Sequence, residues 1–193
     1  MPKSNRISTL TALFLLLVDL TGCQSELSRT QPEQFDNPEF SIKASNLLFF
    51  RNVRSYYYQQ VHDTLQPLEV YRWHNYTHKP NAPQIQPLLV INTLQDQATM
   101  LVELRLPHGR KVQNFCLILT SVSGRDTLLC QTTDAPQIHH QLLTRLYRAI
   151  ENKVQIDYLA KNQKLLTLFS TKKEQSEFMI QVRDYLRLTG AYD

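Results

Sequence analysis

Hydrophobic and polar positions alternate over several short stretches of this chain, which is the period of a half-buried β-strand. The clearest case runs from Ala98 to Leu106, where apolar side chains occupy every second position. Stretches rich in apolar, β-branched and aromatic residues predict further strands over residues 41–53, 68–76, 88–94, 115–120, 127–132, 154–160 and 165–169. Short polar links join 88–94 to 98–106 and 115–120 to 127–132, so each of these pairs predicts a β-hairpin.

The period lengthens to that of an amphipathic helix in two places near the C-terminus. The first helix is predicted to follow Asp134, with Gln137 three residues on in the position of a capping box. The face it would bury is formed by Ile138, Leu142, Leu146 and Ile150, one turn apart.

The second helix has signals at both ends. Thr171 and Glu174 form a second capping box, and Gly190 stands where a helix commonly ends. The face it would bury is formed by Phe178, Val182, Tyr185, Leu186 and Thr189. Strands followed by a helix, two strands and a helix predict an α+β domain, with a largely antiparallel sheet and two C-terminal helices packed on one face.

The first residues have the organisation of an export signal. Lys3 and Arg6 precede an apolar run over residues 10–18. A membrane-spanning helix needs about 20 apolar residues, so this run has the length of the hydrophobic region of a signal peptide. The interpretation is that the chain is made as a precursor and exported.

The sequence Leu20-Thr21-Gly22-Cys23 resembles the lipobox of bacterial lipoprotein precursors. The resemblance covers residues 1–23 and implies cleavage before Cys23 and lipidation of its thiol. Asp19, a charge just ahead of the box, departs from the pattern and leaves an ordinary signal peptide or an uncleaved anchor as alternatives. Gln24 in place of an acidic residue resembles the sorting signal for an outer membrane.

These signals divide the chain into three parts. Residues 1–22 are interpreted as the signal peptide, and residues 23–40, polar with two prolines, as a lipidated flexible tether. Residues 41–193 are predicted to form a single domain. The protein is then expected to be attached to a bacterial membrane through its lipid, at the outer membrane or cell surface.

Composition excludes some classes of function. The chain of 193 residues contains only 4 glycines, too few and too scattered for a phosphate-binding loop or a dinucleotide fingerprint. Its formal charge of +4 is spread without a Lys/Arg run, so nucleic acid is not expected as a partner. No cofactor is implied.

Cys116 and Cys130 lie at equal distances from Ser123, the centre of the second predicted hairpin. With the loop centred there, Cys116 faces Cys130 and apolar residues face one another on both sides of the pair of strands. An exported protein folds where thiols oxidise, so a structural cross-strand disulfide is predicted. The alternative is two reduced cysteines that pack as small apolar side chains.

The stretch 51–76 combines basic and aromatic side chains that suit a ligand. Aromatic rings stack on sugars and cations, and arginine binds carboxylates and phosphates in a forked geometry. The alternative is that these side chains pack in the core, since tyrosine and tryptophan favour strands. The possible ligand surface comprises Arg51, Arg54, Tyr57, Tyr71, Arg72 and Trp73.

Patterns for metal binding and catalysis are weak. His74 and His78 lie four residues apart in a strand-like context, which separates them by about 13 Å and is too far for one ion. Of the adjacent His139 and His140, one is expected to pack and the other to face solvent. His62 and Asp63 have no serine in a nucleophile elbow, so no catalytic residue is assigned.

The sequence alone thus indicates a lipid-anchored envelope protein with a non-catalytic domain that binds an envelope protein or a glycan, or that serves a structural role in a complex. The alternative is a small envelope hydrolase acting on peptidoglycan or polysaccharide. The acidic residues are scattered singly along the chain, which disfavours the hydrolase.

Overall fold

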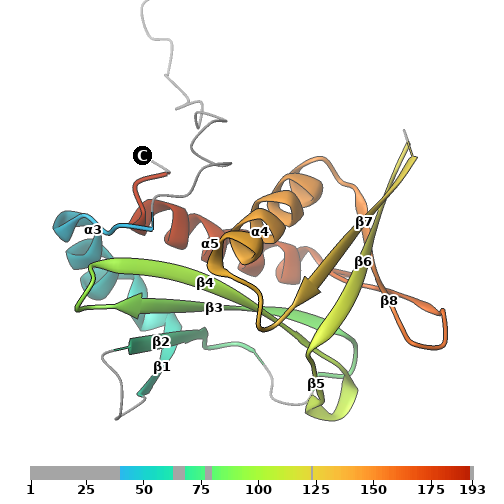
Figure 1. Ribbon diagram of the computed structural model, residues 1–193, viewed down its shortest axis with the longest axis horizontal. Coiled ribbons are helices and arrows are strands. Elements are labelled where there is room, and N and C mark those ends of the chain that lie inside the picture. The colour runs from blue at the N-terminus through green and yellow to red at the C-terminus, as the bar shows by residue number, and fades with distance from the viewer. Residues whose placement is uncertain (1–39, 63–67, 77–79, 123, 192–193) are drawn as a thin grey trace, which may run out of the picture.

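The computed structural model describes residues 40–62, 68–76, 80–122 and 124–191, and confirms the predicted α+β class. Every strand pairing within the described residues is antiparallel, and the strands form two sheets (Figure 1). The predicted signal peptide, Cys23 and nearly all of the predicted tether lie outside the described residues.

The first sheet has five strands in sequence order. They are β1 (Tyr58–His62), β2 (Leu68–Trp73), β3 (Gln84–Asn92), β4 (Gln97–Arg105) and the short β5 (Lys111–Val112). The second sheet has the order β7-β6-β8-β9, formed by β6 (Asn114–Ser121), β7 (Gly124–Gln131), β8 (Gln155–Leu159) and β9 (Leu165–Thr167). The chain leaves the second sheet after β7 and returns to it at β8, because α4 lies between them in sequence.

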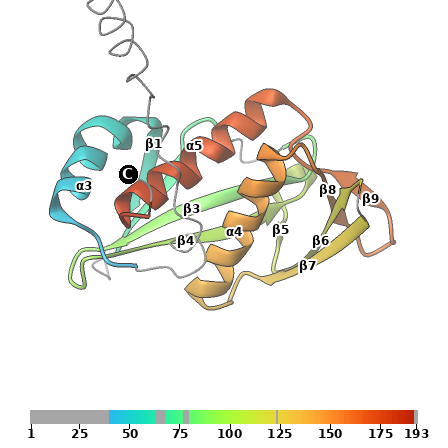
Figure 2. The ribbon, with the colours of Figure 1, turned by 90° about the horizontal axis from the view of Figure 1, so that it is seen from above.

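The two C-terminal helices, α4 (Pro136–Glu151) and α5 (Lys172–Leu188), lie over one face of the first sheet, and α4 also contacts β7 and β8 (Figures 1 and 2). The alternation predicted for β4 is confirmed, since Met100, Val102 and Leu104 are buried beneath the helices. One continuous core therefore joins both sheets and both helices. Its completely enclosed side chains include Leu89, Leu104, Leu117, Leu143, Leu146, Phe178 and Leu186.

The predicted ends of the two helices have different outcomes. In α5, the Thr171 hydroxyl accepts from the Glu174 backbone N–H, the Glu174 carboxylate accepts from the Thr171 N–H, and Gly190 follows the helix with a positive φ, all as predicted. The capping box predicted for the first helix is wrong. The helix starts at Pro136, whose fixed φ suits a first helical position, and Asp134 instead accepts from the backbone N–H of Gln131.

The strand predicted over residues 41–53 is wrong. The chain there forms α3 (Ala44–Phe49), then one π-helical turn, η2 (Phe50–Arg54), and the short 3-10 turn η3 (Ser55–Tyr57). The apolar run Leu47-Leu48-Phe49-Phe50 fits either a buried strand or a helix, because periodicity does not distinguish the two in so short a stretch. The buried Phe50 attaches this helical segment to the core.

The predicted pairing of Cys116 with Cys130 is wrong by one residue. In the hairpin of β6 and β7, Cys130 is opposite Phe115 and Cys116 is opposite Leu129. Successive side chains of a strand point to opposite faces, so the two thiols lie on different sides of the sheet. Both cysteines are free.

Candidate functional site

The six residues of the predicted ligand surface do not form an open surface. Tyr71 and Trp73 are buried on the core side of β2, and Arg72 lies on the opposite face of that strand. Phe50 contacts the rings of both Tyr58 and Tyr71, with centroids 5.5 and 5.1 Å apart. The alternative reading, that these aromatic residues pack in the core, describes most of the cluster.

Arg54 and Tyr57 close the outer side of this cluster. The Tyr57 ring is stacked on Trp73 at 5.9 Å, and the Arg54 guanidinium lies 4.7 Å from the centre of the Tyr57 ring. Arg54 also binds Asp184 of α5 through two hydrogen bonds of 2.8 and 3.0 Å. Its hydrogen bonds with this carboxylate raise the pKa of Arg54, and the guanidinium serves the fold rather than an external anion.

Arg51 is engaged in a second ion pair. Its guanidinium is 2.8 Å from the Glu69 carboxylate, which also accepts a hydrogen bond from the Tyr71 hydroxyl at 2.7 Å. Burial raises the pKa of Tyr71, and the hydrogen bond to Glu69 adds to the effect. Arg51 and Arg54 thus each have an acidic partner within the protein.

A second cluster brings a cysteine, a histidine and an aspartate near one another. The thiol of Cys130 is 4.0 Å from Nδ1 of His139, and Asp134 lies in the loop between them. Burial, followed by the charge of Asp134, raises the pKa of Cys130 to about 12. A nucleophilic cysteine requires a lowered pKa, so this arrangement does not produce a reactive thiolate.

His139 and His140 are both buried, so the prediction that one of them faces solvent is wrong. Nδ1 of His139 accepts from the backbone N–H of Val102 at 3.2 Å, and the buried Nε2 has no hydrogen-bond partner of normal geometry among the described residues. Nδ1 of His140 is 3.0 Å from the Tyr185 hydroxyl. The first turn of α4 therefore enters the core with polar groups that bind its neighbours.

His74 is exposed, whereas His78 and the side chain of His62 lie outside the described part of the structure. Within the residues that the structure describes, no group of three or more His, Cys, Asp or Glu side chains could hold a metal ion.

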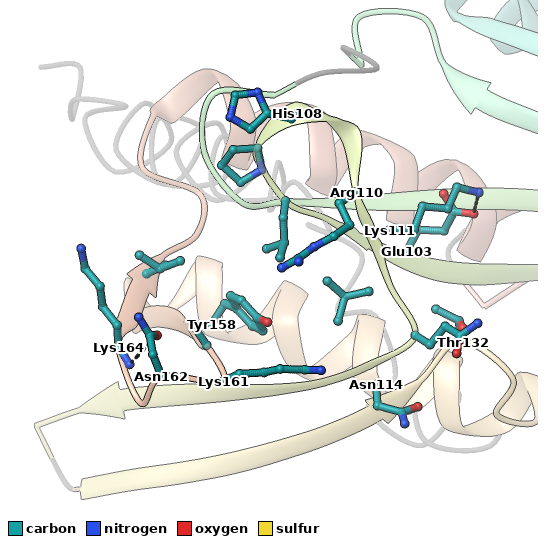
Figure 3. A pocket seen from close by; sticks show the side chains of 16 residues that line it. Glu103, His108, Arg110, Lys111, Asn114, Thr132, Tyr158, Lys161, Asn162 and Lys164 are labelled. Atoms are coloured by element: carbon teal, nitrogen blue, oxygen red, sulfur yellow. Dashed lines mark hydrogen bonds and ion pairs between the residues drawn. The ribbon is translucent and has the colours of Figure 1, made fainter.

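A groove of about 1360 Å³ lies between the two sheets. One wall is formed by β5 and the turn before it, η4 (Pro107–Gly109), and the other by the end of β8 and its connection to β9. Figure 3 shows Arg110 and Lys161 extending from these opposite walls on either side of Tyr158. We call this pocket the basic groove.

Positive charge predominates along the basic groove. Its cationic side chains are Arg110, Lys111, Lys161 and Lys164, joined by the exposed His108. Glu103 is the one carboxylate among the described residues that line it. This carboxylate is 2.6 Å from Nζ of Lys111 and 3.2 Å from the guanidinium of Arg105, so its charge is matched within the protein.

The floor of the basic groove is apolar. It is lined by Leu106 and Tyr158, which are buried, and by Leu166, which packs against the core. Side-chain amides lie at its edges, from Gln113, Asn114 and Asn162. An apolar floor with cations and amides above it can receive a ligand that has both a flat face and negative groups.

Sequence reasoning missed the basic groove. In the sequence, residues 107–109 and 161–162 indicate only turns, and about 50 positions separate them in the chain. They lie side by side because β8 pairs with β6, which directly follows β5. The signal available in sequence was that each of these two turns carries basic residues.

Within the described residues, no helix combines the length and the apolar character needed to cross a membrane. The chain matches no protein-family model, and neither the curated proteins nor the solved structures contain one with significant similarity to it.

Proposed function

We propose that this chain is a lipid-anchored, non-catalytic binding protein of the bacterial envelope, and that the basic groove binds an anionic glycan. One observation carries the proposal: four cations line the groove, and the one described carboxylate among them is neutralised by Lys111 and Arg105. The unmatched positive charge is available for the carboxylates or phosphates of a ligand.

The dimensions and edges of the basic groove favour a chain of sugars over a small metabolite. Pockets for small molecules commonly measure about 300–1,000 Å³, and this groove, at about 1360 Å³, exceeds that range. At its edges, Asn114 and Asn162 offer amide donors and acceptors for the hydroxyl groups of sugars. An acidic protein segment is the competing ligand.

Binding is favoured over hydrolysis by the state of Glu103. Most glycosidases use two carboxyl groups across the scissile bond, about 5–9.5 Å apart, one of them free to donate a proton. Glu103 is ion-paired, and the other described side chains that line the groove include no second carboxyl group.

The resemblance of Leu20-Thr21-Gly22-Cys23 to a lipobox supports the anchor. One acyl chain gives only marginal membrane binding and two hold a protein stably, so lipidation of Cys23 keeps the domain at the envelope. A fatty-acid probe fed to cells that express the protein should label the wild type and not the Cys23→Ala variant. Equal labelling of both would refute the anchor.

The ligand is tested with defined polymers. Wild-type protein should bind polygalacturonate, a polymer with a carboxylate on each sugar, and should not bind neutral dextran. Replacing both Arg110 and Lys161 with glutamine should weaken polygalacturonate binding at least about tenfold and reduce its salt dependence, because two charge-assisted contacts are lost.

The matched control replaces Lys172 and Lys173 with glutamine. These lysines are exposed on the first turn of α5 and do not line the groove, so the net charge falls equally while the groove stays intact. Equal losses of polygalacturonate binding in the two double variants would show that the overall charge of the protein, and not the groove, determines binding. Binding of polyglutamate but not of polygalacturonate would replace the glycan with an acidic polypeptide.

A further inference from the structure

The helical segment of residues 44–57 is apolar on two opposite sides. On its inner side, Phe50 is buried against Tyr58 and Tyr71, and Leu47 packs on the core. On its outer side Leu48, Phe49, Val53 and Tyr56 recur at helical spacing. A helix on a protein surface normally has polar residues on its outer side, so this second apolar side needs a partner.

The outer side is open in the structure. Tyr56 is 88% exposed, Leu48 is 62% exposed and Val53 is 49% exposed, and Phe49 is also accessible. We call these four residues the outer apolar face. Large apolar side chains occur singly on most surfaces, but here four share about three turns of one helical segment.

The charge around the outer apolar face is positive. Arg51 and Arg54 are already paired with Glu69 and Asp184, so this charge comes from Lys43, the N-cap residue of α3, and from Arg187. From α5, the guanidinium of Arg187 lies 5.2 Å from the centre of the Phe49 ring. Apolar and tyrosine side chains bordered by lysine and arginine are the composition that binds at the interface of an anionic membrane.

We propose that the outer apolar face of α3, η2 and η3 lies in the headgroup interface of the membrane to which the chain is anchored. The inference rests on the proposed membrane anchor. The described chain begins at Phe40, four residues before α3, so the face follows closely in sequence the segment that leads back to Cys23. The anchor and the face would then hold the domain at two points, which fixes its orientation.

A membrane fits the face better than a second copy of the chain. A stable protein interface takes about 20–30 residues from each side, whereas this face offers four apolar side chains on a narrow segment. A bilayer needs no matching shape, and shallow insertion of a few apolar side chains adds to the hold of a lipid anchor.

Tryptophan reporters test the proposal. Tyr56→Trp places the fluorophore on the outer apolar face, and Leu129→Trp places it at another exposed position, on β7 of the second sheet, away from α3 (Figures 1 and 2). Purified protein is added to vesicles of phosphatidylethanolamine and phosphatidylglycerol, with and without brominated lipid, and the signal of the native Trp73 is subtracted. Brominated lipid should quench the reporter at 56 at least about twofold more than the one at 129 if the face inserts at the interface.

A second variant separates insertion from folding. Leu48→Ser with Val53→Ser, introduced beside Tyr56→Trp, should abolish the quenching while the melting temperature changes little, because both side chains are exposed. Equal quenching at 56 and 129, or none at 56, would overturn the proposal.

Other occupants give different signals. A second copy of the chain would make emission at 56 depend on protein concentration without vesicles. If the residues before Phe40 covered the face, the emission of the tryptophan at 56 would already be blue-shifted without vesicles. Either result overturns membrane docking. Fatty-acid labelling of Cys23 reports on the anchor separately, so an unlabelled chain that is still quenched at 56 would refute only the anchor.

Discussion

Arg54 and Asp184 are 130 positions apart in sequence and meet through two hydrogen bonds of 2.8 and 3.0 Å. Asp184 also accepts a hydrogen bond of 2.8 Å from the hydroxyl of Tyr58, and both Asp184 and Tyr58 are buried. This network ties the helical segment of residues 44–57 to α5.

Replacing Asp184 with alanine should destabilise the protein by about 3 kcal/mol, because removing one partner of a buried ion pair leaves the other charge uncompensated. Tyr58→Phe removes one hydrogen bond from the same carboxylate and should cost about 1–2 kcal/mol. Urea unfolding followed by circular dichroism measures both.

The control for Asp184 is the exposed ion pair of Asp126 and Arg145. Asp126→Asn should change stability by less than about 1 kcal/mol, since solvent screens exposed pairs. Similar losses of stability for Asp184→Ala and Asp126→Asn would show that burial of the ion pair between Arg54 and Asp184 does not increase its contribution to stability.

The capping box of α5 should contribute measurably to the stability of the protein. Thr171→Ala removes the hydroxyl that accepts from the backbone N–H of Glu174 and should destabilise the protein by about 1 kcal/mol. Ser176→Ala, at an exposed position of the same helix, should leave stability within about 0.5 kcal/mol. Thermal unfolding of both variants tests this, and no difference between them would argue against the cap.

The sequence predicts a strand or helix correctly where one face of the element is buried and the other is exposed to solvent. The alternation over residues 98–106 and the turn spacing of Phe178, Val182 and Tyr185 each allow one interpretation, and both are confirmed. The segment 41–53 misleads for the opposite reason. Its apolar residues face both the core and the outside, so neither the period of a strand nor that of a helix stands out.

The register of β6 and β7 shows a second limit. Leu117, Ile118, Leu128 and Leu129 occupy both faces of the hairpin, so two registers that differ by one residue both place apolar side chains opposite each other. Centring the loop on Ser123 gave the wrong one, and the predicted disulfide with it. The basic groove could not be predicted either, because its walls meet only through the pairing of β6 with β8.

The corrected register predicts how the thiols react. Burial raises the pKa of Cys130 to about 12, and the Cys130 side chain is enclosed by the core. Burial also raises the pKa of Cys116, but the Cys116 side chain is less enclosed. Iodoacetamide should therefore modify native Cys116 at least about tenfold faster than Cys130, because only an accessible thiolate reacts.

Peptide mass mapping after timed alkylation measures the two rates. In urea, where both side chains are solvated, the rates should become similar. A peptide pair linked between Cys116 and Cys130 in protein purified without reductant would contradict the register of the structure.

His139 should make stability depend on pH. Burial lowers the pKa of His139 below its ordinary value of 6.5, against smaller opposing effects from Asp134 and the backbone of Thr132. Below pH 6.5 the unfolded chain therefore binds a proton that the folded chain does not. The free energy of unfolding decreases as the pH is lowered, until the pH reaches the lowered pKa of His139 in the folded chain. The stabilising contribution of neutral His139 is complete above pH 6.5 and is lost as the solution becomes more acidic.

Urea unfolding at a series of pH values, for wild type and His139→Gln, measures this dependence. Glutamine offers an oxygen to the backbone N–H of Val102 without a group that titrates, so the variant should lose less stability than wild type between neutral and acidic pH. The exposed His74→Gln is the control and should follow the wild-type curve. Parallel curves for wild type and His139→Gln would mean that the pKa of His139 is the same in the folded and unfolded chains, and that burial does not lower it.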